Sequence, residues 1–535
     1  MEKGTRFRQT AIDSVEAAGH KCREAILHYI RTVIATKYPI EAAEIYNNMH
    51  REIGRLTQRC LVYKDKHELL PIQLRDATVA KINRLKRQWV VTPVDKATNN
   101  FAIICPKLYI EVMNKELGIV VEGNAVKAVG NKTYKIATKE LHQLLTEHEQ
   151  LTQSVLGESL TEENRVIPLL WACPKFHKNP VKFRFIAGAR HSSTKQLSVA
   201  LTKILQGIKS HWTRYVTNVG EKKGLNLHWS ISNSGEVIKL LRRGKMPDNS
   251  KLTIADFSTL YTSFEHGVIM SHVSALIEKM FKNAGHKYIA VGRTAYYHSS
   301  EARAGIKLTL TDTIALVHFM VTNSFVQYAG KLFHQKAGIP MGANYAPVLA
   351  DLCLSHMEYS YLTLNPGSAI QMRATTRYID DILTIGSESL IEHAKGIYPE
   401  SLPLSFDDTS KGHGHYLDLF INRNDNSISL YDKRTDFKFT VIRFTDALSN
   451  VPRRDSLNVL YSQVVRIARI CTNTADVVGN ILDIALMLRN KGFEACEINR
   501  CLHKVRKRYP ALFSRHNLYQ RKEMNRTLCS RIENR

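Results

Sequence analysis

The chain has 535 residues and carries 75 Lys and Arg against 49 Asp and Glu, a formal net charge of +26. Its 44% hydrophobic and 23% charged content excludes an intrinsically disordered chain and predicts a globular protein with several cores. A surface this basic attracts polyanions, so nucleic acid is the expected kind of partner.

Three sequence features narrow the class further. No run of 18 apolar residues occurs and the first residues are polar, so we expect neither a membrane partner nor a secretory signal. The nine cysteines form no Cys-x-x-Cys pair, which favours reduced thiols over disulfides or zinc ligands. We therefore expect a soluble protein inside the cell.

Residues 1–86 predict a helical, basic N-terminal extension, because apolar residues such as Ile26 and Ile30 recur at helical spacing. Residues 87–250 predict a mixed unit with a strand at 101–105 and chain breaks near Gly123 and Gly130. The extension alone does not specify a ligand, although RNA binding fits its charge.

Three carboxylates mark a candidate metal site. Asp256 ends the apolar run 252–255, and Asp380 with Asp381 lies at what reads as the two-residue turn of a β-hairpin within 377–385. Such a cluster can hold two divalent ions ~4 Å apart, which is phosphoryl-transfer geometry. The alternative is a solvated Asp-Asp turn with no ligand. Tyr261, close behind Asp256, could lie beneath a sugar and exclude a 2′-hydroxyl.

A glycine-rich segment lies between these acids. Gly338 and Gly342 precede a helical pattern at 348–357, so backbone can approach a ligand closely and a helix N-terminus is offered to it. The alternative is an ordinary Gly/Pro turn before a core helix.

The C-terminal part predicts helices at 456–471 and 475–490, the second ending near Gly492. Residues 500–535 hold eleven Lys or Arg and two acids, and predict a basic tail. The tail either contacts a nucleic-acid backbone or is a solubilising terminus.

The order of acidic strand, glycine-rich turn with helix, and Tyr-x-Asp-Asp hairpin resembles the palm of reverse transcriptases. Within that class the chain most resembles Penelope-like retroelements, relatives of telomerase, and Met341 is typical of them at a position where telomerases and many retroviral-type enzymes carry Gln. Further matching segments lie at 92–96, 171–178, 183–186, 415–419, 449–452 and 461–471.

The resemblance implies an α+β fold of the right-hand polymerase type, with fingers, a palm built as an antiparallel sheet with helices, and a helical thumb, preceded by the helical extension. The implied boundaries are 1–86 for the extension, 87–250 for the fingers, 251–423 for the palm and 424–535 for the thumb and tail.

The resemblance also assigns the site residues. Two Mg²⁺ ions, with Mn²⁺ as a possible substitute, would be held at Asp256, Phe257, Asp380 and Asp381, of which the three aspartates would be catalytic. The nucleotide would lie against Lys96, Arg184, Phe257, Tyr261, Met341 and Gly342. The template and primer would lie against Lys175, Lys178, Tyr378, Leu417 and Arg466.

The implied activity is RNA-directed DNA polymerisation, with an RNA template, a DNA primer and deoxynucleoside triphosphates. A GIY-YIG nuclease motif is not visible, so an endonuclease-lacking form is expected. The basic cluster at 504–508 suggests a nuclear location. Two alternatives stay open: an inactive or co-opted protein that binds RNA or single-stranded DNA, and telomerase-like terminal synthesis. The sequence leaves the oligomeric state unknown.

Overall fold

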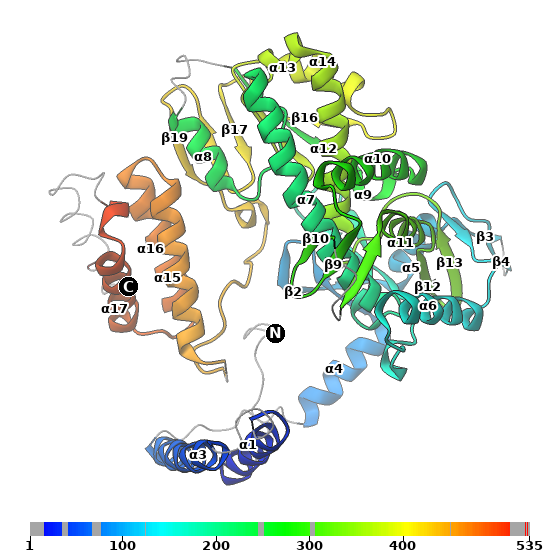
Figure 1. Ribbon diagram of the computed structural model, residues 1–535. Helices are drawn as coiled ribbons and strands as arrows, with labels where there is room; N and C mark the ends of the chain where they lie inside the picture. Colours follow the sequence, from blue (N-terminus) through cyan, green and yellow to red (C-terminus); the bar gives the residue numbers. More distant parts are fainter. Residues whose placement is uncertain are drawn as a thin grey trace.

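The computed structural model describes residues 15–34, 41–66, 76–122, 125–243, 251–299, 305–449, 451–513, 530 and 532. The N-terminal extension is helical as predicted, and its first two long helices pack together (Figure 1). Its elements are α1 (Val15–Tyr29), η1 (Ile30–Ile34), α3 (Ala42–Lys66) and α4 (Asp76–Gln88).

The unit that follows contains three antiparallel hairpins packed beside helices. Its strands are β1 (Val90–Val94), β2 (Ala97–Ile104), β3 (Ile119–Glu122), β4 (Ala125–Ala128), β5 (Tyr134–Ile136), β6 (Leu170–Lys175) and β7 (Lys182–Ala187). Its helices are α5 (Pro106–Leu117), α6 (Leu141–Leu156), η2 (Glu162–Asn164), η3 (Ala189–His191), α7 (Lys195–Lys223) and α8 (Ser234–Arg243).

A four-stranded antiparallel sheet in the order β14-β15-β8-β16 forms the centre of the molecule. Its strands are β8 (Leu252–Phe257), β14 (Thr375–Tyr378), β15 (Asp381–Ile385) and β16 (Leu404–Phe406). The helices around it are α9 (Leu260–Ser263), α10 (His266–Ala284), α11 (Leu310–Thr322), α12 (Ala346–Leu364), α13 (Pro366–Gln371) and α14 (Ser389–Ile397).

Both faces of this sheet are buried, because alternate residues of a strand point to opposite sides. Ala255 and Ile382 join the core formed with α7, α10 and α12. Ile254 and Leu383 join a second core with the C-terminal helices. The sheet is thereby packed between two hydrophobic cores, and the ends of its strands remain available for a site.

Two smaller sheets complete the middle of the chain. One contains β9 (Tyr288–Val291), β10 (Ala295–His298) and β11 (Ile306–Thr309) and packs on α7. The other joins β12 (Phe325–Tyr328) and β13 (Lys331–Gln335) to β5. Residues 325–335, which the sequence assigned to the palm, therefore pair with β5, which lies in the range 87–250 predicted for the fingers. The division of the chain into extension, fingers, palm and thumb stays a prediction.

The C-terminal part is helical, as predicted, and follows a small three-stranded sheet. Its elements are β17 (His413–Tyr416), β18 (Leu419–Asn422), β19 (Ser427–Leu430), η4 (Lys433–Asp436), α15 (Arg453–Ile470), α16 (Thr474–Arg489), α17 (Ala495–Arg508) and η5 (Pro510–Phe513). The expected basic tail begins inside α17, which packs on α15, and its residues 514–529 lie outside the described residues.

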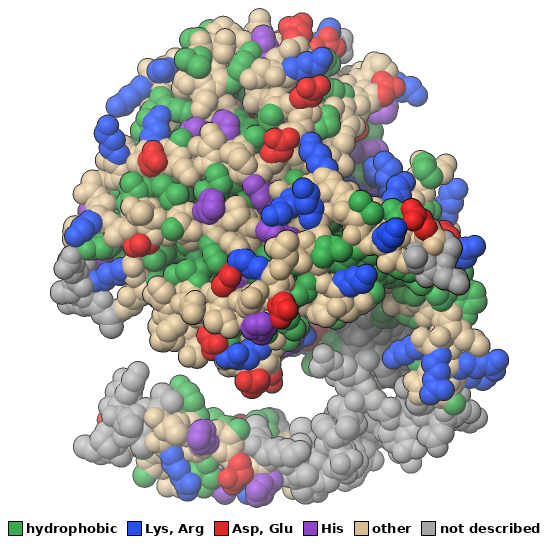
Figure 2. Space-filling model, turned by 90° about the vertical axis from the view of Figure 1, so that its right-hand side faces the viewer, with side chains coloured by type: hydrophobic (Ala, Val, Ile, Leu, Met, Phe, Trp, Pro, Cys, Tyr) green, Lys and Arg blue, Asp and Glu red, His purple; other side chains and the backbone are tan. Residues whose placement is uncertain are grey.

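The surface of the described chain agrees with the charge expectation. On the face drawn in Figure 2, Lys and Arg side chains are spread among fewer acidic ones rather than gathered in one stripe. Among the described helices, none has the length and apolar content needed to cross a membrane.

Candidate active site

The central sheet brings the three predicted carboxylates to one end. In the antiparallel register of β8 and β15, Asp256 lies directly opposite Asp381. Asp381 also pairs with Tyr378 across the hairpin, so the two turn residues are Ile379 and Asp380. The prediction that both acids occupy the turn was wrong by one position, because the turn begins one residue earlier.

Ile379 adopts a left-handed backbone conformation, with φ of 55°. A β-branched residue in that region is a true outlier that costs about 1–3 kcal/mol, and such strain persists only where the surroundings impose it. The amide of Phe257 donates to the carbonyl of Asp380 at 3.3 Å, and the hydroxyl of Tyr416 donates to the carbonyl of Asp381 at 3.3 Å. The hairpin tip is thus held from both sides.

The three acids repel one another. Limited hydration raises the pKa of Asp256 to about 7, although its side chain reaches the surface, and repulsion by Asp380 and Asp381 adds to the shift. Burial raises the pKa of Asp381 to about 6, again with repulsion from Asp380, while Lys433 opposes the shift. Three carboxylates that repel one another would be stabilised by a divalent cation, and Mg²⁺ prefers such oxygen ligands.

In the described part of the chain, no three His, Cys, Asp or Glu side chains are already gathered around one metal position. Metal binding by Asp256, Asp380 and Asp381 therefore stays a prediction. Phe257, assigned to the metal and the nucleotide, has a buried ring that packs edge-on against Tyr398 at 4.9 Å. Its side chain is not available to a ligand, so only its main chain could take part.

A cluster of cations faces these acids. Arg184 forms an ion pair with the buried Asp95, with Nη1 3.0 Å from Oδ1. The pKa of Lys96 is lowered by burial and then by nearby Lys433. Burial and then Arg184 lower the pKa of Lys175. Asp95 offsets part of the repulsion among these cations by raising the pKa of both lysines, and a bound anion such as a triphosphate would relieve more of it.

Lys433 was not anticipated from the sequence. It lies in η4, at the start of a strap, defined here as residues 431–447, that joins β19 to α15. The strap contacts strand β2: the side-chain amide nitrogens of Asn99 and Asn100 donate to the carbonyls of Ile442 and Thr440, each at 2.9 Å. These contacts place a cation from the C-terminal part beside the acids of the central sheet.

Aromatic rings reinforce the strap. Phe437 packs against His177 with ring centroids 5.5 Å apart, and Phe439 packs against Phe176 at 6.1 Å. Phe176 and His177 belong to the tip of the β6–β7 hairpin, next to Lys178, which is exposed. The strap therefore fixes the position of the predicted Lys175 and Lys178 segment.

The glycine-rich segment packs against residues 261–264, which follow strand β8. The amides of Gly338 and Ile339 donate to the carbonyls of Phe264 and Tyr261, both at 2.7 Å. A Cβ on Gly342, whose φ is 125°, would lie 2.2 Å from the carbonyl oxygen of Ala187. Gly342 therefore needs to be glycine. The main chain of Tyr261 is fixed beside the segment, and its role beneath a nucleotide stays a prediction.

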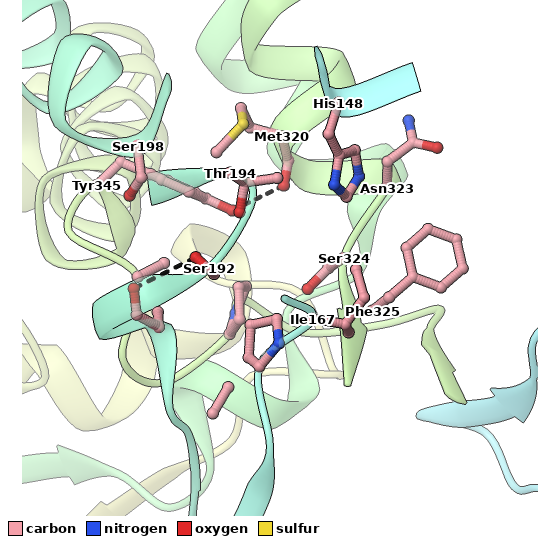
Figure 3. A pocket seen from close by; sticks show the side chains of 15 residues that line it. His148, Ile167, Ser192, Thr194, Ser198, Met320, Asn323, Ser324, Phe325 and Tyr345 are labelled. Carbon is pink, nitrogen blue, oxygen red and sulfur yellow. Dashed lines mark hydrogen bonds between the residues drawn. The ribbon is translucent and has the colours of Figure 1, made fainter. Parts of the chain in front are cut away.

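Behind this segment lies a cavity of about 40 Å³, seen in Figure 3. The Nδ1 atom of its buried His148 lies 2.7 Å from the Ser193 hydroxyl, and burial lowers the pKa of His148 to about 4. The hydroxyl of Tyr345 donates to the carbonyl of Met320 at 2.7 Å. The space suits ordered water and is too small for a nucleotide, so the cavity supports the loop rather than binding substrate.

The remaining predicted residues are distributed around the hairpin. Met341 and Tyr378 are partly exposed, and Leu417 lies at a φ of 57° in the turn between β17 and β18. Arg466 donates to Asp418 of that turn through Nε at 2.8 Å. Arg466 thus orients the turn while its side chain stays 40% exposed, and its role at the template and primer stays a prediction.

Comparison with known proteins agrees with this architecture. The sequence matches no protein-family model and no curated protein. Telomerase from Candida albicans, solved with a fragment of telomeric RNA, is similar with a TM-score of 0.56 at 14% identity, over 84% of this chain and 71% of that one. Telomerase from Candida tropicalis with the same kind of RNA fragment has a TM-score of 0.45 at 13% identity, over 84% and 68%.

An RNA polymerase complex of a double-stranded RNA virus scores lower, with a TM-score of 0.35 at 11% identity over 68% and 29%. Of these three structures, only the first exceeds 0.5, and at such identities the likeness shows the fold alone. The chain therefore has the right-hand polymerase fold of telomerase reverse transcriptase, as predicted.

Proposed function

We propose that this chain is an RNA-directed DNA polymerase of the Penelope-like class. The observation that carries the proposal is the register that sets Asp256 opposite Asp381, with Asp380 at the adjoining turn and Lys96, Arg184 and Lys433 nearby. Acids on one side and cations on the other form the charge pattern that phosphoryl transfer requires.

Each residue has a defined task in this account. The three aspartates hold two Mg²⁺ ions, or Mn²⁺, which supply a lowered pKa at the attacking 3′-hydroxyl and neutralise charge on the leaving pyrophosphate. Lys96, Arg184 and Lys433 hold the triphosphate in line with the primer end.

Tyr261 would select deoxynucleotides over ribonucleotides. The carbonyl of Tyr261 accepts a hydrogen bond from the amide of Ile339, which fixes its main chain beside the glycine-rich segment. Its ring would lie below the sugar and exclude a 2′-hydroxyl. The template is RNA and the primer DNA, and the basic surface binds their backbones in a salt-dependent way. A nuclear location fits a substrate of DNA ends.

The test is deoxynucleotide incorporation on a poly(rA)/oligo(dT) duplex with Mg²⁺ or Mn²⁺, comparing the parent chain, Asp380→Asn and Asp408→Asn. Asp408 is an exposed acid outside the cluster, so it controls for the loss of a charge. Extension by the parent and by Asp408→Asn, but not by Asp380→Asn, supports the proposal. Duplex binding without extension by any of the three contradicts it and favours a nucleic-acid-binding protein.

Telomerase-like terminal synthesis is the second candidate, favoured by the TM-score of 0.56 to a telomerase. The two functions differ in their template. A fixed RNA that co-purifies with the chain and dictates a short repeated product favours the telomerase-like function. Synthesis on any supplied RNA favours the Penelope-like one, to which Met341 also points.

A further inference from the structure

Arg377, the residue before Tyr378 in β14, is completely buried. Its Nη1 donates to Asp351 Oδ1 at 2.7 Å, and its Nε and Nη2 donate to the two carboxylate oxygens of Glu358, the latter at 3.2 Å. Both acids project from α12, the helix that covers the catalytic sheet. A fork of donors matched to two carboxylates is a geometry that only arginine provides.

The acids that hold Arg377 are themselves held. Lys209 of α7 reaches Asp351 Oδ2 at 2.5 Å, and the Ser230 hydroxyl lies 2.9 Å from both oxygens of Asp351. The hydroxyl of Tyr398 donates to Glu358 at 2.8 Å. Two cations thus balance two anions, and every carboxylate oxygen has a donor, as a buried polar network needs in order to be rigid.

The network contacts the catalytic turn at one atom. Nη1 of Arg377 also donates to the carbonyl oxygen of Ile379 at 3.0 Å. Ile379 is the residue in the left-handed conformation, and Asp380 follows it directly. The main chain of Arg377 is fixed in turn, since its amide donates to the carbonyl of Trp229 at 2.7 Å.

We propose that Arg377 is a positioning residue: held by Asp351 and Glu358, it fixes the Ile379 carbonyl and so sets the orientation in which Asp380 is presented to metal. The inference rests on the proposed function, because the orientation of Asp380 matters only if that carboxylate binds an ion. It explains why a strained isoleucine is tolerated at the turn, since the buried guanidinium supplies the contact that opposes relaxation.

The test replaces Arg377 by Lys in the full chain and compares it with Arg453→Lys. Arg453 is also ion-paired, to Glu497 at 2.6 Å, but it lies in the thumb helices and away from the hairpin. Lysine keeps the charge and cannot bond Ile379 and both carboxylates together. The first readout is Mn²⁺ binding followed by electron paramagnetic resonance, which does not depend on activity.

For Arg377→Lys we expect ~10-fold weaker Mn²⁺ binding and ~100-fold lower kcat, with the KM for deoxynucleotide within ~3-fold of the parent, because small misplacements act on the chemical step. Arg453→Lys should match the parent in all three. A folded Arg377→Lys chain with parental Mn²⁺ affinity and kcat overturns the positioning role.

A second substitution at Ile379 distinguishes a positioning role of Arg377 from a purely structural one. Glycine adopts the left-handed conformation without penalty, so adding Ile379→Gly to Arg377→Lys should restore kcat by ~10-fold. No restoration contradicts the role given to Ile379. If Arg377→Lys does not fold, Tyr398→Phe removes one bond to Glu358 and keeps the buried charges: weaker Mn²⁺ binding supports the inference, and unchanged binding overturns it.

The two proposals fail in different ways. A parent chain that neither binds Mn²⁺ nor extends a primer contradicts the proposed function. An active parent whose Arg377→Lys variant is equally active overturns the positioning role alone.

Discussion

Neutralising Asp381 should stabilise the metal-free protein above neutral pH while abolishing catalysis. The pKa of this partly buried carboxyl is raised from 3.8 to about 6 by burial and by repulsion from Asp380. A raised carboxyl pKa contributes stability that is complete below the unfolded value, near 4, and is lost as pH rises through the folded value, about 6. Ionised Asp381 therefore destabilises the folded state fully at pH 8, and most of this destabilisation is absent at pH 4.5, where the carboxyl of the folded protein is protonated.

The magnitude follows from the same shift. About 2 pKa units correspond to ~3 kcal/mol at most, and the partial exposure of Asp381 reduces this to ~1–2 kcal/mol. We expect Asp381→Asn to be more stable than the parent by that amount at pH 8 in EDTA, and by only about a third of it at pH 4.5. Asparagine has the same shape and no charge, so packing should change little.

The assay is chemical denaturation at both pH values, with Asp408→Asn as control because that acid is exposed and its pKa is lowered by Ser410. Adding Mg²⁺ should stabilise the parent and leave Asp381→Asn unaffected, since binding to the native state alone stabilises it. The same pH dependence for parent and Asp381→Asn, or a less stable variant at pH 8, would refute the reasoning.

Three further predictions concern the walls of the site. Lys433→Ala should raise the KM for deoxynucleotide in steady-state kinetics with little change in melting, whereas an equal effect from the exposed Lys438→Ala would contradict a specific role. Gly342→Ala should lower the free energy of unfolding by ~2 kcal/mol or more because its methyl group would meet a carbonyl, while Gly267→Ala, in an open helical position, should raise it by ~0.5–1 kcal/mol in the same melts. Asn100→Ala removes two hydrogen bonds to the strap and should speed amide exchange across residues 437–442, measured by mass spectrometry; unchanged exchange would show that the strap is held otherwise.

The carboxylate site could be predicted because its signals are local. An apolar run that ends in Asp256 and a hairpin that carries Asp380 and Asp381 each specify strands, and antiparallel pairing then brings the acids together. The exact turn could not be predicted, because Ile379 adopts a conformation that its branched side chain disfavours. The buried contact from Arg377 to the Ile379 carbonyl, together with those from Phe257 and Tyr416, is a long-range interaction that sequence spacing does not reveal.

Other parts of the site depend on contacts that sequence spacing does not reveal. Lys433 is near the acids because the strap bonds Asn99 and Asn100, more than 300 residues earlier in the chain. Arg377 reads as a surface residue of a strand, since arginine is rarely buried without partners. Its partners Asp351 and Glu358 lie within a helix whose apolar pattern gives no sign of a buried ion-pair network.

Strand β8 and the β14–β15 hairpin should act as one catalytic unit. The most direct measurement is the single-nucleotide incorporation rate, by rapid quench on an RNA-templated DNA primer, for Asp256→Asn, Asp381→Asn and the double variant. The account predicts that each single change lowers the rate by ~10³-fold or more and that the double variant is no slower, because residues acting as a unit are not additive. Independent contributions would contradict it: each single variant would lose much less than ~10³-fold, and the two losses would multiply in the double variant.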